Sequence, residues 1–118
     1  MEETKKPYDL EDRTFALAAN VRVFVKELPK TDGNYEDIRQ LIRSSGSVAA
    51  NYIEANEALS KKDFLLRIKI CRKEAKESRL WLRLLETNSA ATEHKRAALL
   101  QEATELMNIF GAIVRKSE

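Results

Sequence analysis

The sequence predicts an all-α fold, an up-down-up-down antiparallel four-helix bundle, and three observations lead to it. Apolar residues recur every three or four positions in four long segments, and no segment shows the apolar-polar alternation of a half-buried strand. The chain has only three glycines and two prolines, and 34% of its residues are charged, against roughly 25% in ordinary globular chains, which favours long solvated helices. Short connections between the segments favour antiparallel neighbours.

The first helix is predicted over residues 9–28. Its apolar positions share one face of a helical wheel, and the proline that follows cannot continue a helix. These positions are Leu10, Leu17, Val21, Phe24 and Leu28, followed by Pro29.

The second helix is predicted from Asn34 to about Leu59, after a turn-forming Lys-Thr-Asp-Gly sequence at residues 30–33. Asn34 is expected to cap this helix by accepting a hydrogen bond from a first-turn amide. Its apolar face consists of Tyr35, Ile38, Leu41, Ile42, Val48, Tyr52, Ile53 and Leu59.

The third and fourth helices are predicted over residues 60–86 and from 88–92 to near Arg115. Ser60 with Asp63 three residues later indicates a capping box at the start of the third helix. Apolar or small residues then recur in steps of four and three, the spacing of a continuous helix-packing seam. The seam consists of Phe64, Ile68, Cys71, Ala75, Ser78, Leu82 and Leu85.

Basic residues form a separate stripe on the helix over 60–86. The net charge of +2 is too small to indicate nucleic-acid binding by itself. The clustering of basic residues in one stripe is the feature that indicates it. The stripe contains no aromatic residue, so RNA or DNA would be bound through its phosphate backbone. The alternative is an ordinary solvated face, with Lys73 and Lys76 paired with nearby glutamates. The residues assigned to nucleic-acid binding are Lys69, Arg72, Lys73, Lys76, Arg79 and Arg83.

Large apolar residues also lie outside the predicted packing seams of the first and third helices. A lone bundle would leave them exposed, so we expect a homo-oligomer that uses these two helices, with Trp81 near the centre of the interface. The alternatives are a monomer with a thick core, and a structural or adaptor protein that binds another protein through the same surface. The residues assigned to the oligomer interface are Phe15, Ala19, Val23, Leu66, Ile70, Trp81 and Leu84.

Three polar residues of the second helix, Arg43, Asn51 and Glu54, are predicted to form a structural polar network between packed helices. A buried carboxylate must be paired or protonated, and Arg43 could pair with Glu54. The alternative is that Glu54 acts as a general base.

Neither enzymatic activity nor a metal or other cofactor is expected. The chain has one histidine, His94, and one cysteine, Cys71, which are too few for a di-iron or zinc site. No nucleophile motif or phosphate-binding glycine loop is present. The seam position of Cys71 indicates a buried apolar side chain.

The 118 residues are expected to form a single domain, 1–118, in which residues 1–8 are a flexible N-terminus. The N-terminus lacks the apolar run of a secretory signal, and no window approaches the ~18 apolar residues of a membrane span. A cytoplasmic protein without membrane association is therefore expected, and the single cysteine suits a reducing compartment.

Residues 40–55 read Gln-Leu-Ile-Arg-Ser-Ser-Gly-Ser-Val-Ala-Ala-Asn-Tyr-Ile-Glu-Ala. This run resembles the signature of the four-helix-bundle proteins encoded by intervening sequences within bacterial 23S ribosomal RNA genes. The similarity continues through residues 63–64, 73–78, 81–82 and 102–106, and so covers nearly the whole chain. Ile42 replaces the first arginine of the family's usual pair, Ile53 replaces an alanine, and Ala55 stands where glycine is usual. Asn51 and Glu54 are retained.

The resemblance implies a ring-shaped homo-oligomer, a pentamer, that is non-enzymatic and associated with nucleic acid. Relatives of the family include the accessory variability determinant of diversity-generating retroelements, which binds a reverse transcriptase and nucleic acid. The partners implied for this chain are therefore its own copies, RNA or DNA, and a protein such as a nucleic-acid enzyme.

Overall fold

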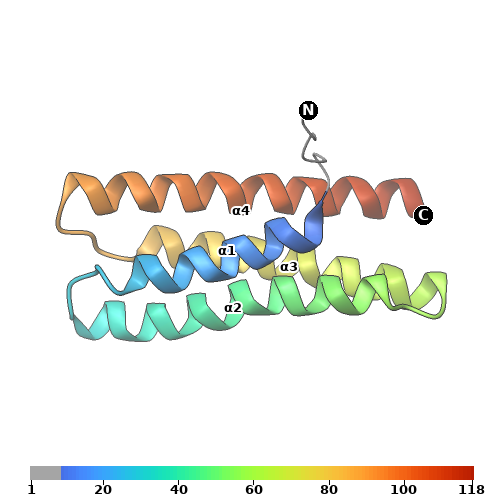
Figure 1. The fold of residues 1–118 in the computed structure, drawn as a ribbon, viewed down its shortest axis with the longest axis horizontal. Coiled ribbons are helices and arrows are strands. Elements are labelled where there is room, and N and C mark those ends of the chain that lie inside the picture. The colour runs from blue at the N-terminus through green and yellow to red at the C-terminus, as the bar shows by residue number, and fades with distance from the viewer. Residues whose placement is uncertain (1–8) are drawn as a thin grey trace, which may run out of the picture.

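The computed structural model describes residues 9–118, and the predicted flexible segment 1–8 lies outside the described residues. The described chain forms four α-helices and no strand, and consecutive helices run antiparallel (Figure 1). The all-α prediction is therefore confirmed. The helices are α1 (Leu10–Val25), α2 (Asp32–Asn56), α3 (Lys61–Leu84) and α4 (Ala90–Ser117).

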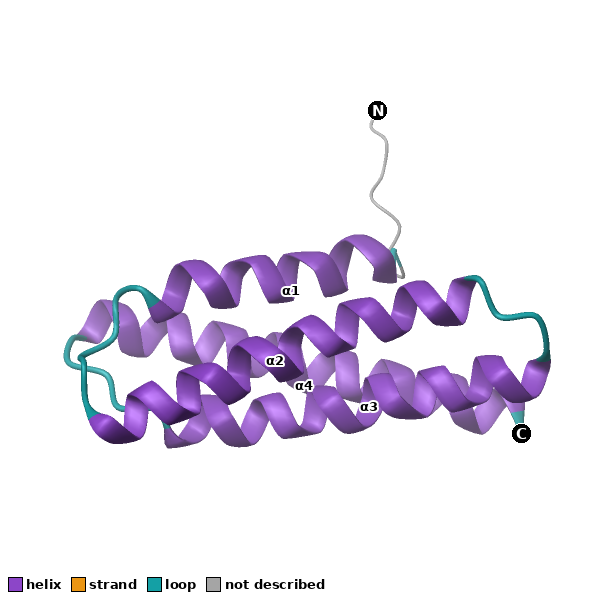
Figure 2. Cartoon of the chain, turned by 90° about the horizontal axis from the view of Figure 1, so that it is seen from below, coloured by secondary structure: helices purple, strands orange, loops and turns teal. Residues whose placement is uncertain are grey.

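Each helix packs against two others, in the cyclic order α1, α2, α3, α4. Contacts join α1 to α2, α2 to α3, α3 to α4 and α4 back to α1, so α1 and α3 lie diagonally across the bundle. The connections α1–α2 and α3–α4 lie at the same end (Figure 2). This arrangement decides which side chains can share a surface.

The core lies along the predicted seams. All the seam positions of α3 are buried except Phe64, which is half-buried. They meet fully buried side chains from the other helices, among them Leu17, Leu41, Leu106 and Phe110. The spacing of apolar residues therefore identified the core face of α3 correctly.

The predicted helix ends need three corrections. α1 ends at Val25 rather than at residue 28, and α2 ends at Asn56, three residues before the fully exposed Leu59. The cap of α2 is Thr31, not Asn34: Oγ1 of Thr31 accepts a hydrogen bond from N of Asn34 at 3.1 Å. Thr31 has the extended backbone of an N-cap, and this starts the helix at Asp32. The predicted cap of α3 is confirmed, because Ser60 accepts from N of Asp63 at 3.0 Å.

Asn34 has another role, because its side chain is buried between the two connections at one end of the bundle. Its Nδ2 donates to the carbonyl oxygens of Pro29 at 3.0 Å and of Glu86 at 2.9 Å. Its Oδ1 accepts from the backbone N of Glu86 at 2.8 Å. Asn34 therefore joins the α1–α2 loop to the chain after α3.

Candidate nucleic-acid interface

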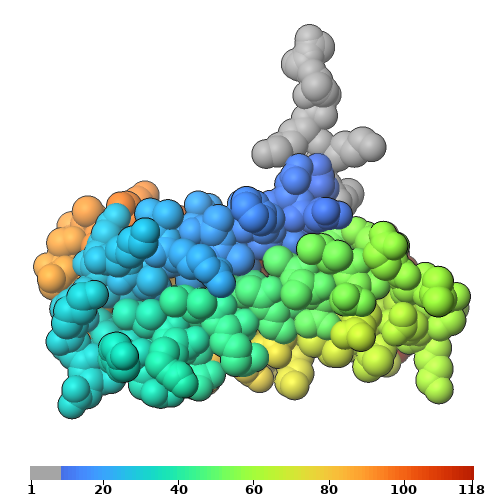
Figure 3. Space-filling view, turned by 60° about the horizontal axis from the view of Figure 1, so that its bottom comes forward, coloured from blue at the N-terminus to red at the C-terminus, as the bar shows by residue number. Residues whose placement is uncertain are grey.

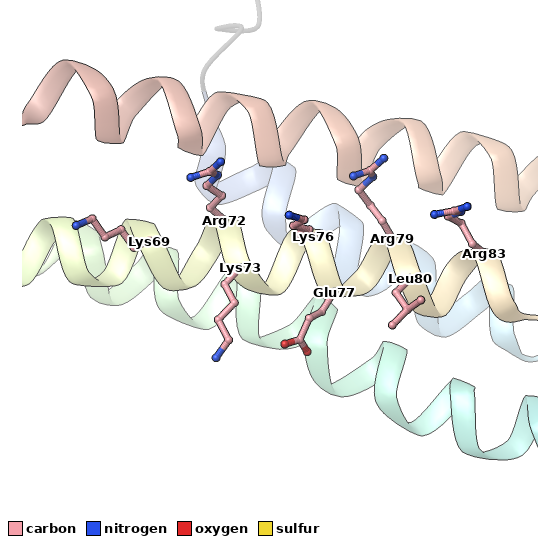
Figure 4. A pocket seen from close by; sticks show the side chains of 8 residues that line it. All are labelled: Lys69, Arg72, Lys73, Lys76, Glu77, Arg79, Leu80 and Arg83. Carbon is pink, nitrogen blue, oxygen red and sulfur yellow. The ribbon is translucent and has the colours of Figure 1, made fainter.

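An open groove of about 590 Å³ follows the outer side of α3, and basic side chains surround it (Figure 4). All six cations that the sequence assigned to nucleic-acid binding line this one groove. The lining residues are Lys69, Arg72, Lys73, Lys76, Glu77, Arg79, Leu80 and Arg83.

The cations lie in two directions because of their helical spacing. Five of them follow steps of three and four from Lys69 to Arg83, which keeps them on one side of α3. Arg72 and Arg79 point toward α4, whereas Lys73 points away from α4, toward the α2 side (Figure 4). Nη1 of Arg79 lies 3.5 Å from Sδ of Met107, and Nε of Arg79 is buried without a hydrogen-bond partner in the described chain. A row of positive charge therefore lies along the α3–α4 seam.

Acidic side chains leave most of this row unpaired. Within residues 9–118, the only ion pair made by the six cations joins Nζ of Lys69 to Oε2 of Glu118, at 3.8 Å. The interpretation in which Lys73 and Lys76 pair with nearby glutamates is therefore wrong for the structure described. Four of the six cations are exposed and without an ion pair, namely Arg72, Lys73, Lys76 and Arg83.

The two nearest glutamates in the sequence of α3 are instead held by α2. Nη2 of Arg43 lies 3.3 Å from Oε1 of Glu74 and 3.0 Å from Oε1 of Glu77. The Glu74 side chain is only 10% exposed, whereas Arg43 is half exposed. Hydrogen bonding to Glu74 raises the pKa of Arg43, so this guanidinium stays charged. Arg43 thus neutralises carboxylates that would otherwise lower the positive potential of the groove.

The predicted polar network is therefore only partly correct. Arg43 does contact a neighbouring helix, and Asn51 accepts from Nη1 of Arg67 on α3 at 3.0 Å. Glu54 joins neither contact: its side chain is exposed and has no hydrogen bond or ion pair within the described residues. Glu54 lies on the solvent side of α2, and its separation from Arg43 is about 16 Å along the helix, too far for the two side chains to pair.

Carboxylates of α4 and of the chain just after α1 are also paired away from the groove, where α1 and α4 meet. Arg13 of α1 contacts Glu102 of α4 through two hydrogen bonds, at 2.8 and 3.0 Å, and Glu105 at 3.1 Å. Lys95 of α4 contacts Glu27 at 2.8 Å. These pairs separate charge across the bundle, with mixed charge at the α1–α4 seam and cations along the α3–α4 seam.

The residues assigned to an oligomer interface divide into two groups on opposite helices. On α1, Phe15 is 69% and Val23 is 59% exposed, and Ala19 between them is half-buried. On α3, Leu66 and Leu84 are each 52% exposed. The space-filling view shows α1 and α2 side by side on one face, with α3 along the lower edge, separated from α1 by α2 (Figure 3). The two groups therefore do not form one continuous patch on a single chain.

The other two interface candidates on α3 are partly covered by their own chain. Ile70 is half-buried, and Trp81 is half-buried and packs against the core. Nε1 of Trp81 is buried without a hydrogen-bond partner in the described chain. Sequence reasoning missed Leu80, which is 45% exposed within the basic groove. The sequence pattern could have identified Leu80, since it precedes the interface candidate Leu84 by one helical turn.

Comparison with known proteins identifies the family. Residues 7–112 match the sequence profile of the 23S rRNA-intervening sequence proteins. The chain belongs to this family. The resemblance found in the sequence is thereby confirmed. The comparison with curated proteins finds no match.

A solved structure supports the 23S rRNA-intervening sequence fold. The chain is similar to a crystal structure of a protein with unknown function from the S23 ribosomal protein family of Bacteroides thetaiotaomicron VPI-5482. The two share 27% sequence identity and superpose with a TM-score of 0.76. The match covers 89% of this chain and 94% of the Bacteroides chain.

Cys71 and His94, considered above for metal binding, lie in different surroundings. Among residues 9–118, no group of three or more histidine, cysteine, aspartate or glutamate side chains is placed to hold a metal ion. Cys71 is fully buried, and burial raises the pKa of its thiol to about 12. His94 is exposed near the start of α4. None of the helices in the described part of the chain combines the length and apolar character needed to cross a membrane.

Proposed function

We propose that this 23S rRNA-intervening sequence protein is a non-enzymatic, cytoplasmic homo-oligomer that binds the phosphate backbone of RNA or DNA. The observation that supports the proposal is the basic groove along α3, where four exposed cations have no acidic partner within residues 9–118. Arg43 strengthens this surface by holding Glu74 and Glu77. Neutralised cations would offer little to a polyanion, whereas unpaired ones can release counterions from it.

The groove suits backbone contacts more than base recognition. From Lys69 to Arg83 the cationic row extends for about 20 Å along α3, at ~1.5 Å per residue. None of the residues that line it is aromatic, so bases would find no stacking platform. Binding is therefore expected to depend strongly on salt and weakly on sequence.

The diagonal placement of α1 and α3 supports a ring. A two-fold dimer uses the same patch on both copies, whereas the α1 face of one copy meeting the α3 face of the next gives a head-to-tail contact. Head-to-tail contacts form a closed ring when the rotation between copies permits it. The resemblance to the family implies five copies. Repetition of the basic groove around a ring would raise the affinity for a long polyanion through multivalency.

A second candidate function is that of an adaptor for another protein. The exposed side chains of Phe15 and Val23 on α1 favour it, because apolar patches mark protein contacts whether the partner is a copy or a different chain. The adaptor function becomes the better interpretation if the purified protein is monomeric and does not bind nucleic acid.

The experiment compares two variants that lose the same charge. Lys73→Gln/Lys76→Gln/Arg83→Gln removes exposed groove cations that no ion pair holds. Lys26→Gln/Lys30→Gln/Arg39→Gln removes two lysines and one arginine that are exposed outside the groove. Binding to a labelled DNA duplex and to a structured RNA is measured by fluorescence anisotropy over a range of salt concentrations, and helicity by circular dichroism.

The wild-type protein and the control variant should bind at low salt with the same steep salt dependence. For the groove variant, the slope of log K against log salt on DNA should fall by up to ~0.9 for each lost phosphate contact. Equal losses in the two variants would show that only net charge matters. No salt-dependent binding by the wild-type protein would overturn the proposal.

A further inference from the structure

One cation of the groove, Arg72, reaches a buried glycine on α4. Gly111 has no side chain, and the heavy atoms nearest to where its Cβ would lie belong to two arginines. Nη1 of Arg115 lies 3.4 Å from that point and Nε of Arg72 lies 3.6 Å from it. Arg72 comes from α3 and Arg115 from the last turn of α4, so two helices bring guanidinium groups to the same place.

No carboxylate of the described chain pairs with either of these two arginines. Within residues 9–118, neither Arg72 nor Arg115 makes an ion pair, and both side chains are exposed. The acidic residue at this end of α4, Glu118, contacts Lys69 instead. The two guanidinium groups repel each other, and an anion between them would offset that repulsion. The arrangement therefore favours an anionic partner.

The geometry suits a phosphate group. The two nitrogens can be separated by no more than the sum of their distances to the Gly111 position, and the oxygens of one phosphate can accept ~2.8 Å hydrogen bonds from both. Guanidinium groups are the side chains that best match phosphate oxygens. The absence of a Cβ at residue 111 lets both arginine side chains approach the backbone of α4 closely. Glycine is less favourable than alanine in a helix interior, so this close approach of the two side chains to α4 has a conformational cost.

We propose that Arg72 and Arg115 together hold one phosphate of the nucleic-acid backbone over Gly111, which makes α4 the second wall of the binding site. This inference rests on the proposed function and adds to it a residue and a position on α4. The simpler role of Arg115, interaction with the negative end of the α4 dipole, is also open to its neighbour Lys116. That role does not explain why Arg72 reaches the same glycine.

A double-mutant cycle tests whether one phosphate is shared. Arg72→Gln, Arg115→Gln and the double variant are measured against a labelled DNA duplex across salt concentrations. Lys116→Gln is the matched control, because it removes a positive charge from the same turn of α4 and lines a different groove, beside α1. A shared phosphate predicts that each single variant and the double variant all lose about 0.9 from the salt slope on duplex DNA. Two separate phosphates predict a loss of about 1.8 in the double variant, and that result would overturn the shared site.

A variant without a charge change tests the position itself. Gly111→Leu places a side chain where the two flexible arginines approach α4, so it should displace both from a shared phosphate. We expect it to lower affinity to about that of Arg115→Gln while the helicity and the unfolding temperature are maintained. Unchanged affinity in a folded Gly111→Leu protein would contradict the proposal.

Two further outcomes distinguish a backbone-phosphate site at α4 from nucleic-acid binding by α3 alone and from a site for free phosphate. If the wild-type protein and the groove variant confirm nucleic-acid binding but Arg115→Gln behaves like Lys116→Gln, only the inference about α4 fails. Competition by inorganic phosphate distinguishes a backbone phosphate from a free one. We expect inorganic phosphate to displace the duplex no better than chloride at equal ionic strength. Displacement at much lower concentration would indicate a site for free phosphate and overturn the assignment to the backbone.

Discussion

Nη2 of Arg43 on α2 contacts Oε1 of Glu77 on α3 at 3.0 Å, and this contact determines the charge of the neighbouring groove. Glu77 lines the groove and lies four residues after Lys73, the spacing at which side chains on a helix meet. Because Glu77 is turned toward α2, Lys73 keeps its charge for another partner. An arginine outside the groove thus acts on the groove through a carboxylate within it.

Replacement of Arg43 should therefore weaken nucleic-acid binding without removing a phosphate contact. In Arg43→Gln, Glu77 is free to pair with Lys73, so the affinity for a DNA duplex should fall by roughly several-fold, the effect of about one lost phosphate contact. Glu77→Gln alone should bind more tightly than the wild-type protein. In the Arg43→Gln/Glu77→Gln double variant, the affinity should return to at least that of the wild-type protein. Fluorescence anisotropy titrations of the wild-type protein, the two single variants and the double variant measure the four affinities of this double-mutant cycle.

The double variant is the informative one. If Arg43 itself contacted phosphate, removal of Glu77 would improve binding by the same factor whether or not Arg43 were present. A gain from Glu77→Gln that is larger in the Arg43→Gln background supports the positioning role, and an equal gain contradicts it. Thermal unfolding of each variant checks that Glu74, which is largely buried beside Arg43, does not disturb the helix pairing once Arg43 is removed.

The second prediction concerns oligomeric state. We expect light scattering to show an assembly larger than a dimer, well above the 13.5 kDa of one chain. Phe15→Glu on α1 and Leu84→Glu on α3 should each dissociate it, because a head-to-tail contact requires both faces of every copy. Ile53→Glu, at an exposed apolar position on α2, serves as the control and should leave the assembly intact.

Mixing the two variants sharpens this test. In a head-to-tail contact, a Phe15→Glu chain still has an intact α3 face, and a Leu84→Glu chain still has an intact α1 face. An equimolar mixture should therefore form heterodimers through the one remaining good interface, and neither variant alone should. A monomer for the wild-type protein would exclude the ring.

The third prediction compares two residues at the start of α2. Asn34→Ala removes three partly buried hydrogen bonds and leaves backbone groups of Pro29 and Glu86 without their partner, so it should lower the free energy of unfolding by about 2–4 kcal/mol. Thr31→Ala removes only the helix cap and should cost about 1 kcal/mol. Urea unfolding measures both. A larger loss for Thr31→Ala would mean that Asn34 does not join the two connections as described.

Asn34 also shows what sequence patterns could and could not predict here. The α3 seam and the Ser60 cap depend on neighbours three or four residues apart, and both were correct. Asn34 is a good cap by type, but Thr31 is too, and the choice between them depends on Glu86, 52 residues later. Local spacing has no access to such a partner.

The candidate nucleic-acid interface also has a part that local spacing predicts and a part that depends on helix packing. Helical periodicity within α3 was sufficient to gather six cations on one groove. It could not show that Arg43 holds the intervening glutamates, because their pairing depends on how α2 packs against α3. Periodicity within α3 also could not predict that Arg72 and Arg115 approach the same residue. They do so at Gly111, and only because α4 packs against α3.

The last prediction uses the buried thiol of Cys71. Burial raises the pKa of Cys71 to about 12, whereas an unfolded cysteine ionises near ~8.5. Between these values the folded chain keeps a proton that the unfolded chain releases, so the free energy of unfolding falls as the pH rises. Below ~8.5 both states are protonated and the contribution is constant. Above it, this one group can lower the stability by up to about 1.36 kcal/mol for each pH unit.

Urea unfolding of the wild-type protein and of Cys71→Ala from neutral to alkaline pH should isolate this effect. Cys71→Ala is less stable at neutral pH because it leaves a small cavity, but its stability should fall less steeply above ~8.5 than that of the wild-type protein. Burial raises the pKa of Tyr52, and Cys71 contributes to that shift, so the two profiles are compared below ~10, the pKa of an unfolded tyrosine. At slightly alkaline pH the native thiol should react with a disulfide reagent only as fast as the protein opens. Rapid reaction in the folded state, or parallel pH profiles for the two proteins, would place Cys71 outside the core.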